Sequence, residues 1–104
     1  MKKPVIQIIE DDGSMVLSLK ETLNILGYDV LKPIPTGEDG IKAVKENTPD
    51  LVLMDIELHG KMSGINAAES IKQFSDVPII FLTGYSPDSS TNQTKYIEPY
   101  GYLS

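Results

Sequence analysis

The 104-residue sequence contains no cysteine and only one histidine. The absence of cysteine excludes disulfides, thiolate metal ligands and a cysteine nucleophile. A single histidine excludes metal sites that need several imidazole ligands. No apolar run approaches the roughly 18–20 residues of a membrane-spanning helix, and the N-terminal segment turns acidic without a cleavage site. We therefore expect neither a membrane segment nor a signal peptide.

Basic residues are scarce as well. Nine lysines and arginines stand against fifteen acidic residues, which gives a formal net charge of −6. Because a nucleic-acid partner needs a basic face, we expect no direct binding of nucleic acid. The remaining composition, 40% hydrophobic and 23% charged, is that of one globular domain and is too apolar for a disordered chain.

Short apolar runs alternate with stretches of helical periodicity. The three strongest runs are predicted as strands at residues 5–9, 51–54 and 78–82, with weaker strands at 28–31 and 100–104. Helices are predicted at about residues 14–27, 36–47 and 63–74, with a weak helix at 87–95. This alternation indicates an α/β fold with a parallel sheet. The strongest runs are apolar throughout, as central parallel strands are, although such a run can also be a buried helix segment.

Two of the predicted helices carry clear apolar faces. Ser14 is expected to be the N-cap of the first helix, and Gly27 is expected to end it. The inward faces are expected to consist of Val16, Leu19, Leu23 and Leu26 in the helix at 14–27, and of Ile65, Ala68, Ile71 and Phe74 in the helix at 63–74.

Each of the three strong strands ends in a polar group. Glu10 and Asp11 follow the first strand, Asp55 follows the second and Thr83 follows the third. Ligands bind beyond the carboxyl ends of parallel strands, so these groups are expected around one crevice if the strands are neighbours. Three carboxylates in one crevice must hold a proton or a cation, and oxygen ligands favour Mg²⁺ or Ca²⁺. An aspartate beside such a cation can act as a nucleophile toward a phosphoryl group.

Each of these residues also has a simpler interpretation. An acid after a strand is most often a helix N-cap or a solvated loop residue, and the acidic run 10–12 can merely favour the start of the first helix. Thr83 alone is a turn residue, and His59 is expected to be a solvated loop residue. Only the coincidence of acidic and hydroxyl groups at three strand ends favours a functional site.

These same segments resemble the receiver domain of two-component response regulators. The matching motifs are IIEDD at 8–12, DLVLMDI at 50–56, the loop glycines Gly60 and Gly64, PIIFLTG at 78–84 and EPYGYL at 98–103. They occur in the family's order and at the family's spacing over the whole chain. The resemblance implies a flavodoxin-like, doubly wound parallel sheet with strand order 2-1-3-4-5.

The resemblance also implies a phosphoryl-acceptor site. Asp55 would accept a phosphoryl group from a histidine kinase or a phosphotransfer protein. Asp11, Asp55 and the main-chain carbonyl of Glu57 would bind Mg²⁺ directly, and Glu10 would act through a metal-bound water. The chain would catalyse only its own phosphorylation and dephosphorylation, in the cytoplasm.

A switch next to this site is implied in the same way. Thr83 would hydrogen-bond the phosphoryl group and shift on phosphorylation, and Tyr102 would turn inward when Thr83 moves. The surface around the fourth helix and fifth strand would then change toward an output domain or a partner protein. Glu57 and Tyr85 match positions whose side chains tune dephosphorylation.

The sequence departs from the family pattern in two places. The loop at 58–64 is one residue longer than the common form, and His59 stands where proline is usual. The family's lysine after the fifth strand, and its last helix, would come after Ser104. We therefore expect residues 1–104 to be a C-terminally incomplete receiver domain, either an artificially shortened chain or one segment of a longer regulator. Apolar sheet surface exposed in this way would favour a homodimer.

Three other functions stay open. An inert, receiver-like interaction module would need none of the acidic groups, so their presence argues against it. A flavin-binding protein of similar fold is disfavoured because an acidic crevice repels the flavin phosphate. A metal-dependent phosphohydrolase would need an aspartate two residues after its nucleophile, where Glu57 stands.

Overall fold

The secondary structure follows the predicted alternation. The computed structural model describes residues 2–82 and 102–103. The elements are β1 (Val5–Ile9), α1 (Gly13–Ile25), β2 (Asp29–Val30), α2 (Gly37–Asn47), β3 (Leu51–Asp55), α3 (Gly64–Lys72), β4 (Ile79–Leu82) and β5 (Tyr102–Leu103). β2 is shorter than the predicted strand at 28–31, and β3 extends to Asp55. The weak helix predicted at 87–95 lies outside the described residues.

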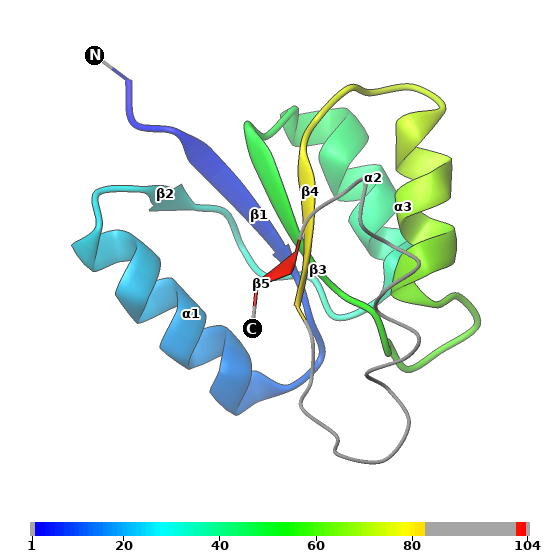
Figure 1. Ribbon diagram of the computed structural model, residues 1–104, viewed down its shortest axis with the longest axis horizontal. Helices are drawn as coiled ribbons and strands as arrows, with labels where there is room; N and C mark the ends of the chain where they lie inside the picture. The colour runs from blue at the N-terminus through cyan, green and yellow to red at the C-terminus, as the bar shows by residue number, and fades with distance from the viewer. Residues whose placement is uncertain (1, 83–101, 104) are drawn as a thin grey trace.

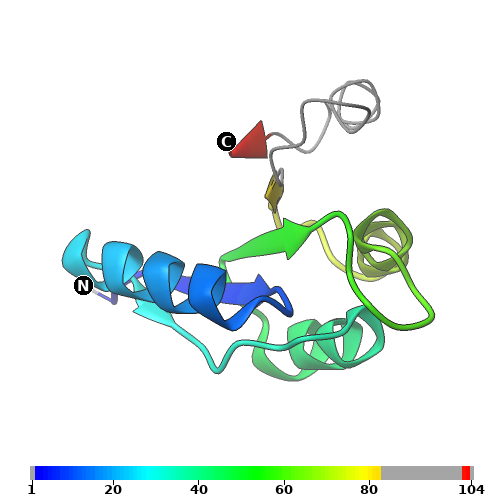
Figure 2. The same cartoon turned by 90° about the horizontal axis from the view of Figure 1, so that it is seen from below.

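The five strands in the described part of the chain all pair in parallel, in the order β2-β1-β3-β4-β5. α1 lies on one face of the sheet, and α2 and α3 lie on the other (Figures 1 and 2). This arrangement confirms the predicted doubly wound, flavodoxin-like α/β fold and its strand order. The short apolar runs are strands and not buried helix segments. No helix in the ranges 2–82 and 102–103 is long and apolar enough to cross a membrane.

The two faces of the sheet are covered unequally. The face toward α2 and α3 buries the larger cluster, which includes Ile9, Met54, Ile71 and Phe81. On the other face α1 contributes no buried residue, although three of its apolar side chains pack against the sheet. The predicted inward position of Leu26 is wrong, since this residue follows the last turn of α1 and is 66% exposed.

α1 begins earlier than the sequence suggests. The prediction of Ser14 as N-cap is wrong, because the side chain of Asp12 accepts hydrogen bonds from the main-chain N–H groups of Ser14 and Met15, at 3.0 and 3.2 Å. The predicted stop at Gly27 is confirmed. This residue has φ +96°, and the N–H of Tyr28 donates to the carbonyl of Leu23, which closes the last turn.

α3 ends earlier than predicted, at Lys72, so Phe74 is not part of its apolar face. Phe74 lies exposed beyond the helix end, and the ammonium group of Lys45 lies 4.9 Å from its ring centroid. The other three predicted positions of α3 do contribute to the core or pack against it.

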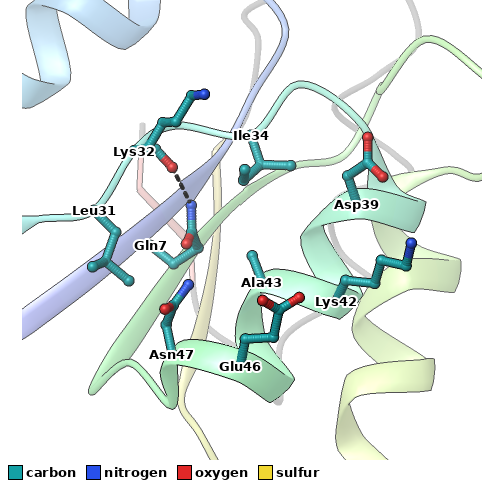
Figure 3. Close-up of a pocket in the computed structure, with 9 residues that line it drawn as sticks. All are labelled: Gln7, Leu31, Lys32, Ile34, Asp39, Lys42, Ala43, Glu46 and Asn47. Carbon is teal, nitrogen blue, oxygen red and sulfur yellow. Dashed lines mark hydrogen bonds between the residues drawn. The ribbon is translucent and has the colours of Figure 1, made fainter.

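A polar side chain lies inside the central strand β1. Gln7 is only 1% exposed, and its Nε2 donates to the main-chain carbonyls of Lys32 and Ile8, at 2.9 and 3.0 Å. It lies beside an open cleft of about 430 Å³ between α2 and the segment that follows β2 (Figure 3). The hydrogen bond from Gln7 to Lys32 therefore holds the segment that follows β2 against the sheet.

Replacement of Gln7 by alanine is expected to lower the free energy of unfolding by about 2 kcal/mol, because a buried side chain and its hydrogen bonds are lost. Asn47→Ala is the matched control, since Asn47 lines the same cleft from the exposed end of α2. Urea denaturation is expected to show a change of no more than about 0.5 kcal/mol for that variant. Equal midpoints for the two variants would contradict the structural role of Gln7.

Candidate functional site

Three carboxylates converge at the C-terminal ends of β1 and β3. The two strands are neighbours, with Ile9 opposite Met54, so the residues that follow them meet at one edge of the sheet. Oxygen atoms of Glu10, Asp11 and Asp55 all lie within 4.8 Å of one another. The structure therefore brings together the three acids that the sequence places at these strand ends. Such an all-oxygen group is suited to a hard divalent cation.

Glu10 is the most deeply placed of the three acids. Its side chain is 6% exposed, and Oε2 accepts a hydrogen bond from the N–H of Asp12 at 3.1 Å. Burial, together with a side-chain hydrogen bond to Asp55, raises the pKa of Glu10 to about 8. Burial also raises the pKa of Asp55, although hydrogen bonds from Glu10 and from the main chain of Glu57 oppose this. Without a cation, the pKa shifts of both Glu10 and Asp55 therefore favour the protonated form of these acids.

Asp11 behaves differently from its two neighbours. Burial opposes its ionisation, but hydrogen bonds from His59 outweigh this and hold the pKa of Asp11 below its ordinary value. The main-chain N–H of His59 donates to Oδ2 of Asp11 at 3.0 Å, and the ring Nδ1 contacts the same oxygen. Asp11 is therefore an ionised carboxylate at neutral pH. In return, this hydrogen bond raises the pKa of His59.

His59 is the residue whose contact the sequence analysis missed. Its side chain is 93% exposed, as expected for a solvated loop residue, yet the loop places its ring against Asp11. The only signal in the sequence was that a histidine occupies a position where the family usually has proline. This difference from the family pattern does not predict which residue the imidazole ring contacts.

The loop after β3 is fixed by hydrogen bonds from two of its main-chain N–H groups. Oδ1 of Asp55 accepts from the N–H of Glu57 at 3.1 Å, and the N–H of Gly64 donates to the carbonyl of Ile56 at 2.9 Å. The start of α3 is therefore held against the end of β3, and the main chain of Glu57 lies next to Asp55.

The predicted switch residues fall at the limits of the described structure. Thr83 and Tyr85 lie outside the described residues. The backbone of Tyr102 is described in β5, where it pairs with Phe81, but its side chain is not. The roles implied for these residues stay predictions.

Comparison with known proteins identifies the family. The sequence profile of the response regulator receiver domain matches residues 6–104. The chain belongs to this family. The receiver domain is 36% identical over 89 residues to the transcriptional regulatory protein YvrH of Bacillus subtilis, an alignment that covers 86% of this chain and 37% of YvrH. The chain thus spans little more than a third of that relative.

Solved structures agree with this assignment. The signal receiver domain of a modulated diguanylate cyclase from Desulfovibrio desulfuricans superposes with a TM-score of 0.83 and 32% identity, covering 98% of this receiver domain and 81% of that chain. The receiver domain of the sensor histidine kinase PA1611 from Pseudomonas aeruginosa has a TM-score of 0.84 at 24% identity, with 99% and 85% covered. That structure holds a magnesium ion in its active-site cleft. At this identity the likeness establishes the fold alone.

Proposed function

We propose that this receiver domain accepts a phosphoryl group on Asp55 in a reaction that depends on Mg²⁺, as one step of a phosphorelay. The observation that carries the proposal is the convergence of Glu10, Asp11 and Asp55 within 4.8 Å at the end of the sheet. Family membership supports a role in two-component signalling. The choice of Asp55 as acceptor and of Mg²⁺ as the cation is supported by the resemblance to the family and by the acidic group at this edge of the sheet.

The donor set fits Mg²⁺. Carboxylate, carbonyl and water oxygens are its preferred ligands, and the site offers at least one carboxylate that is ionised at neutral pH. Asp11, Asp55 and the main-chain carbonyl of Glu57 would hold the ion, and Glu10 would act through a water. Bound there, Mg²⁺ supplies positive charge that offsets the phosphoryl oxygens.

In this proposal Asp55 is the nucleophile. One of its oxygens, Oδ1, is engaged by the N–H of Glu57, which fixes the orientation of the carboxylate. A carboxylate oxygen of Asp55 attacks the phosphorus of a phosphohistidine, the P–N bond breaks, and the electron pair leaves with the imidazole. The product is an acyl phosphate on Asp55. The domain turns over no metabolite in this scheme, and it catalyses only its own phosphorylation and hydrolysis.

The partners follow from this chemistry. A histidine kinase or a phosphotransfer protein in the cytoplasm would supply the phosphoryl group, and an output domain or a partner protein would respond to it. Thr83 and Tyr102 are the proposed switch residues. The homodimer expected from exposed apolar sheet surface stays a prediction. The large apolar side chains that are exposed include Leu17 and Ile25 of α1 and Leu26 just beyond its end.

Intact mass after incubation with acetyl phosphate tests the proposal. The chain is expected to gain one phosphoryl group, about 80 Da, only when Mg²⁺ is present. Asp55→Asn is expected to gain nothing. Asp39→Asn is the matched control, because it removes the same charge from an exposed position on α2, and it is expected to be modified like the original chain. A folded original chain whose mass does not change, or a modified Asp55→Asn variant, would contradict the proposal.

A further inference from the structure

A hydrogen-bond acceptor in the cleft beside α2 has no partner. Nε2 of Gln7 donates to the main-chain carbonyls of Ile8 and Lys32, and these two bonds fix the orientation of the amide. Among the residues that the structure describes, none donates a hydrogen bond to the other polar atom of this amide, Oε1. Gln7 is only 1% exposed, yet Oε1 is not sealed from solvent, since no unpartnered side-chain oxygen in the described ranges is fully buried. The acceptor therefore opens into the cleft that Gln7 lines (Figure 3).

The chain path after β2 explains why this amide is held in place. The N–H groups of Leu31 and Ile34 donate to carbonyls of β1 that are only two residues apart. Three residues of the segment thus face two residues of β1, which makes a bulge. The carbonyl of Lys32 lies in that bulge and takes Nε2 of Gln7 as its donor. Because the bulge uses both hydrogens of the amide nitrogen, it leaves the amide oxygen for a ligand.

The end of the cleft around Gln7 is rich in acceptors and in negative charge. The side chains of Glu46 and Asn47, from the last turn of α2, lie next to Gln7 in the close-up (Figure 3). The C-terminal end of the helix adds a partial negative charge there. The ammonium groups of Lys32 and Lys42, which also line the cleft, point away from Gln7 (Figure 3). This end of the cleft therefore suits a cation that donates several hydrogen bonds.

We propose that this cleft binds the arginine side chain of a partner protein, with the guanidinium group at Gln7 and Glu46. A guanidinium is planar and offers five N–H donors, so it can bond an amide oxygen and a carboxylate together, whereas the ammonium group of lysine is a compact point charge. The apolar lining by Leu31, Ile34 and Ala43 suits the aliphatic stem of arginine. This role does not depend on the acidic site at the strand ends.

The shape of the cleft favours a side chain over a free small molecule. Pockets for small ligands enclose most of the ligand surface. The cleft has a volume of about 430 Å³ and is open to solvent, so it covers one side of an occupant. An arginine that a second protein presents is covered on its other side by that protein. The occupant is therefore expected to come from a protein surface.

The simpler interpretation is a hydrated cleft. A water molecule would then bond Oε1, and the charged side chains would be ordinary solvated groups. In that case the net charge of −6 attracts any cation weakly and without a preferred position. Arginine and lysine would bind alike, and their effects would be spread over the surface.

NMR titration with blocked single amino acids separates the two interpretations. N-acetylarginine methylamide is expected to bind with a dissociation constant of about 1 mM and to shift the side-chain NH₂ signals of Gln7 together with main-chain signals of α2. The lysine and citrulline analogues, which lack the guanidinium group, are expected to bind at least about fivefold more weakly. No shift at Gln7, or arginine and lysine affinities within about twofold of each other, overturns the proposal.

Two matched variants test the position of the guanidinium. Glu46→Gln removes a charge from the cleft and is expected to weaken binding of the arginine probe at least about threefold. Glu69→Gln removes the same charge from an exposed position on α3 outside the cleft and is expected to leave that affinity unchanged. Both changes are on helix surfaces, and the spectra themselves report whether each variant is folded. Equal affinities for the two folded variants overturn the proposed site.

Discussion

An Asp11→Asn variant is expected to bind Mg²⁺ at least about 100-fold more weakly than the original chain. The contacts with His59 hold the pKa of Asp11 below its ordinary value, whereas burial raises the pKa of Glu10 and of Asp55. The amide of asparagine offers a weaker oxygen donor and no charge. Displacement of Mn²⁺ by Mg²⁺, followed by electron paramagnetic resonance, measures the affinity.

The neighbouring residue supplies the control for charge. Asp12→Asn removes the same charge one position away, but the Asp12 side chain caps α1 and accepts from two helix N–H groups. Asparagine caps a helix about as well as aspartate, so the fold is preserved. Mg²⁺ affinity is expected to stay within about threefold of the original, since Asp12 is not among the converging acids. Equal losses in the two variants would mean that net charge, and not a defined ligand, attracts the cation.

The three adjacent acids Glu10, Asp11 and Asp12 have different roles that the sequence alone does not predict. Glu10, Asp11 and Asp12 are alike in composition, and the strand pattern predicts only that they leave the sheet together. Their roles differ because the chain changes direction at residues 10–12. Glu10 is buried under the sheet edge, Asp11 meets the loop after β3, and Asp12 reaches the first N–H groups of α1. The direction of that turn depends on tertiary packing, which the local sequence does not encode.

The strands and their order could be predicted for a physical reason. A central strand of a parallel sheet is covered on both faces, so runs such as 51–54 and 78–82 are apolar throughout. Burial of Met54 and Phe81 in adjacent, paired strands confirms this. Gln7 shows the limit of that rule. It sits in such a run and is buried, because its amide satisfies main-chain carbonyls that no apolar side chain could.

Helix ends were less predictable than helix faces. Leu26 and Phe74 continue the apolar spacing of their helices, yet each lies beyond the last helical turn and is exposed. Hydrophobic spacing alone cannot detect this, because the helix ends where hydrogen bonding ends. In α1 the local signal was Gly27, which adopts the left-handed conformation that closes the helix.

Gly64→Ala is expected to lower the free energy of unfolding by about 3 kcal/mol or more. A Cβ at this position would lie 1.8 Å from the main-chain oxygen of Asp55 and 2.9 Å from the Cα of Ile56. Both atoms belong to backbone, so no side-chain rotation relieves the overlap. The chain must either move α3 away from β3 or break the hydrogen bond from the N–H of Gly64 to the carbonyl of Ile56. Urea denaturation measures the loss.

Gly13→Ala separates this close contact from the general effect of replacing a helical glycine. Gly13 is the first residue of α1, and a Cβ there would meet nothing within 4 Å. That variant is expected to be at least as stable as the original chain, with a gain of up to about 1 kcal/mol, because alanine favours the helix.

The main-chain displacement that Gly64→Ala causes should also reach the acidic site, since the main chain that Gly64 touches belongs to Asp55. Gly64→Ala is therefore expected to weaken Mg²⁺ binding even under conditions where the variant remains folded. If neither the stability nor the Mg²⁺ affinity changes, the loop after β3 does not position Asp55.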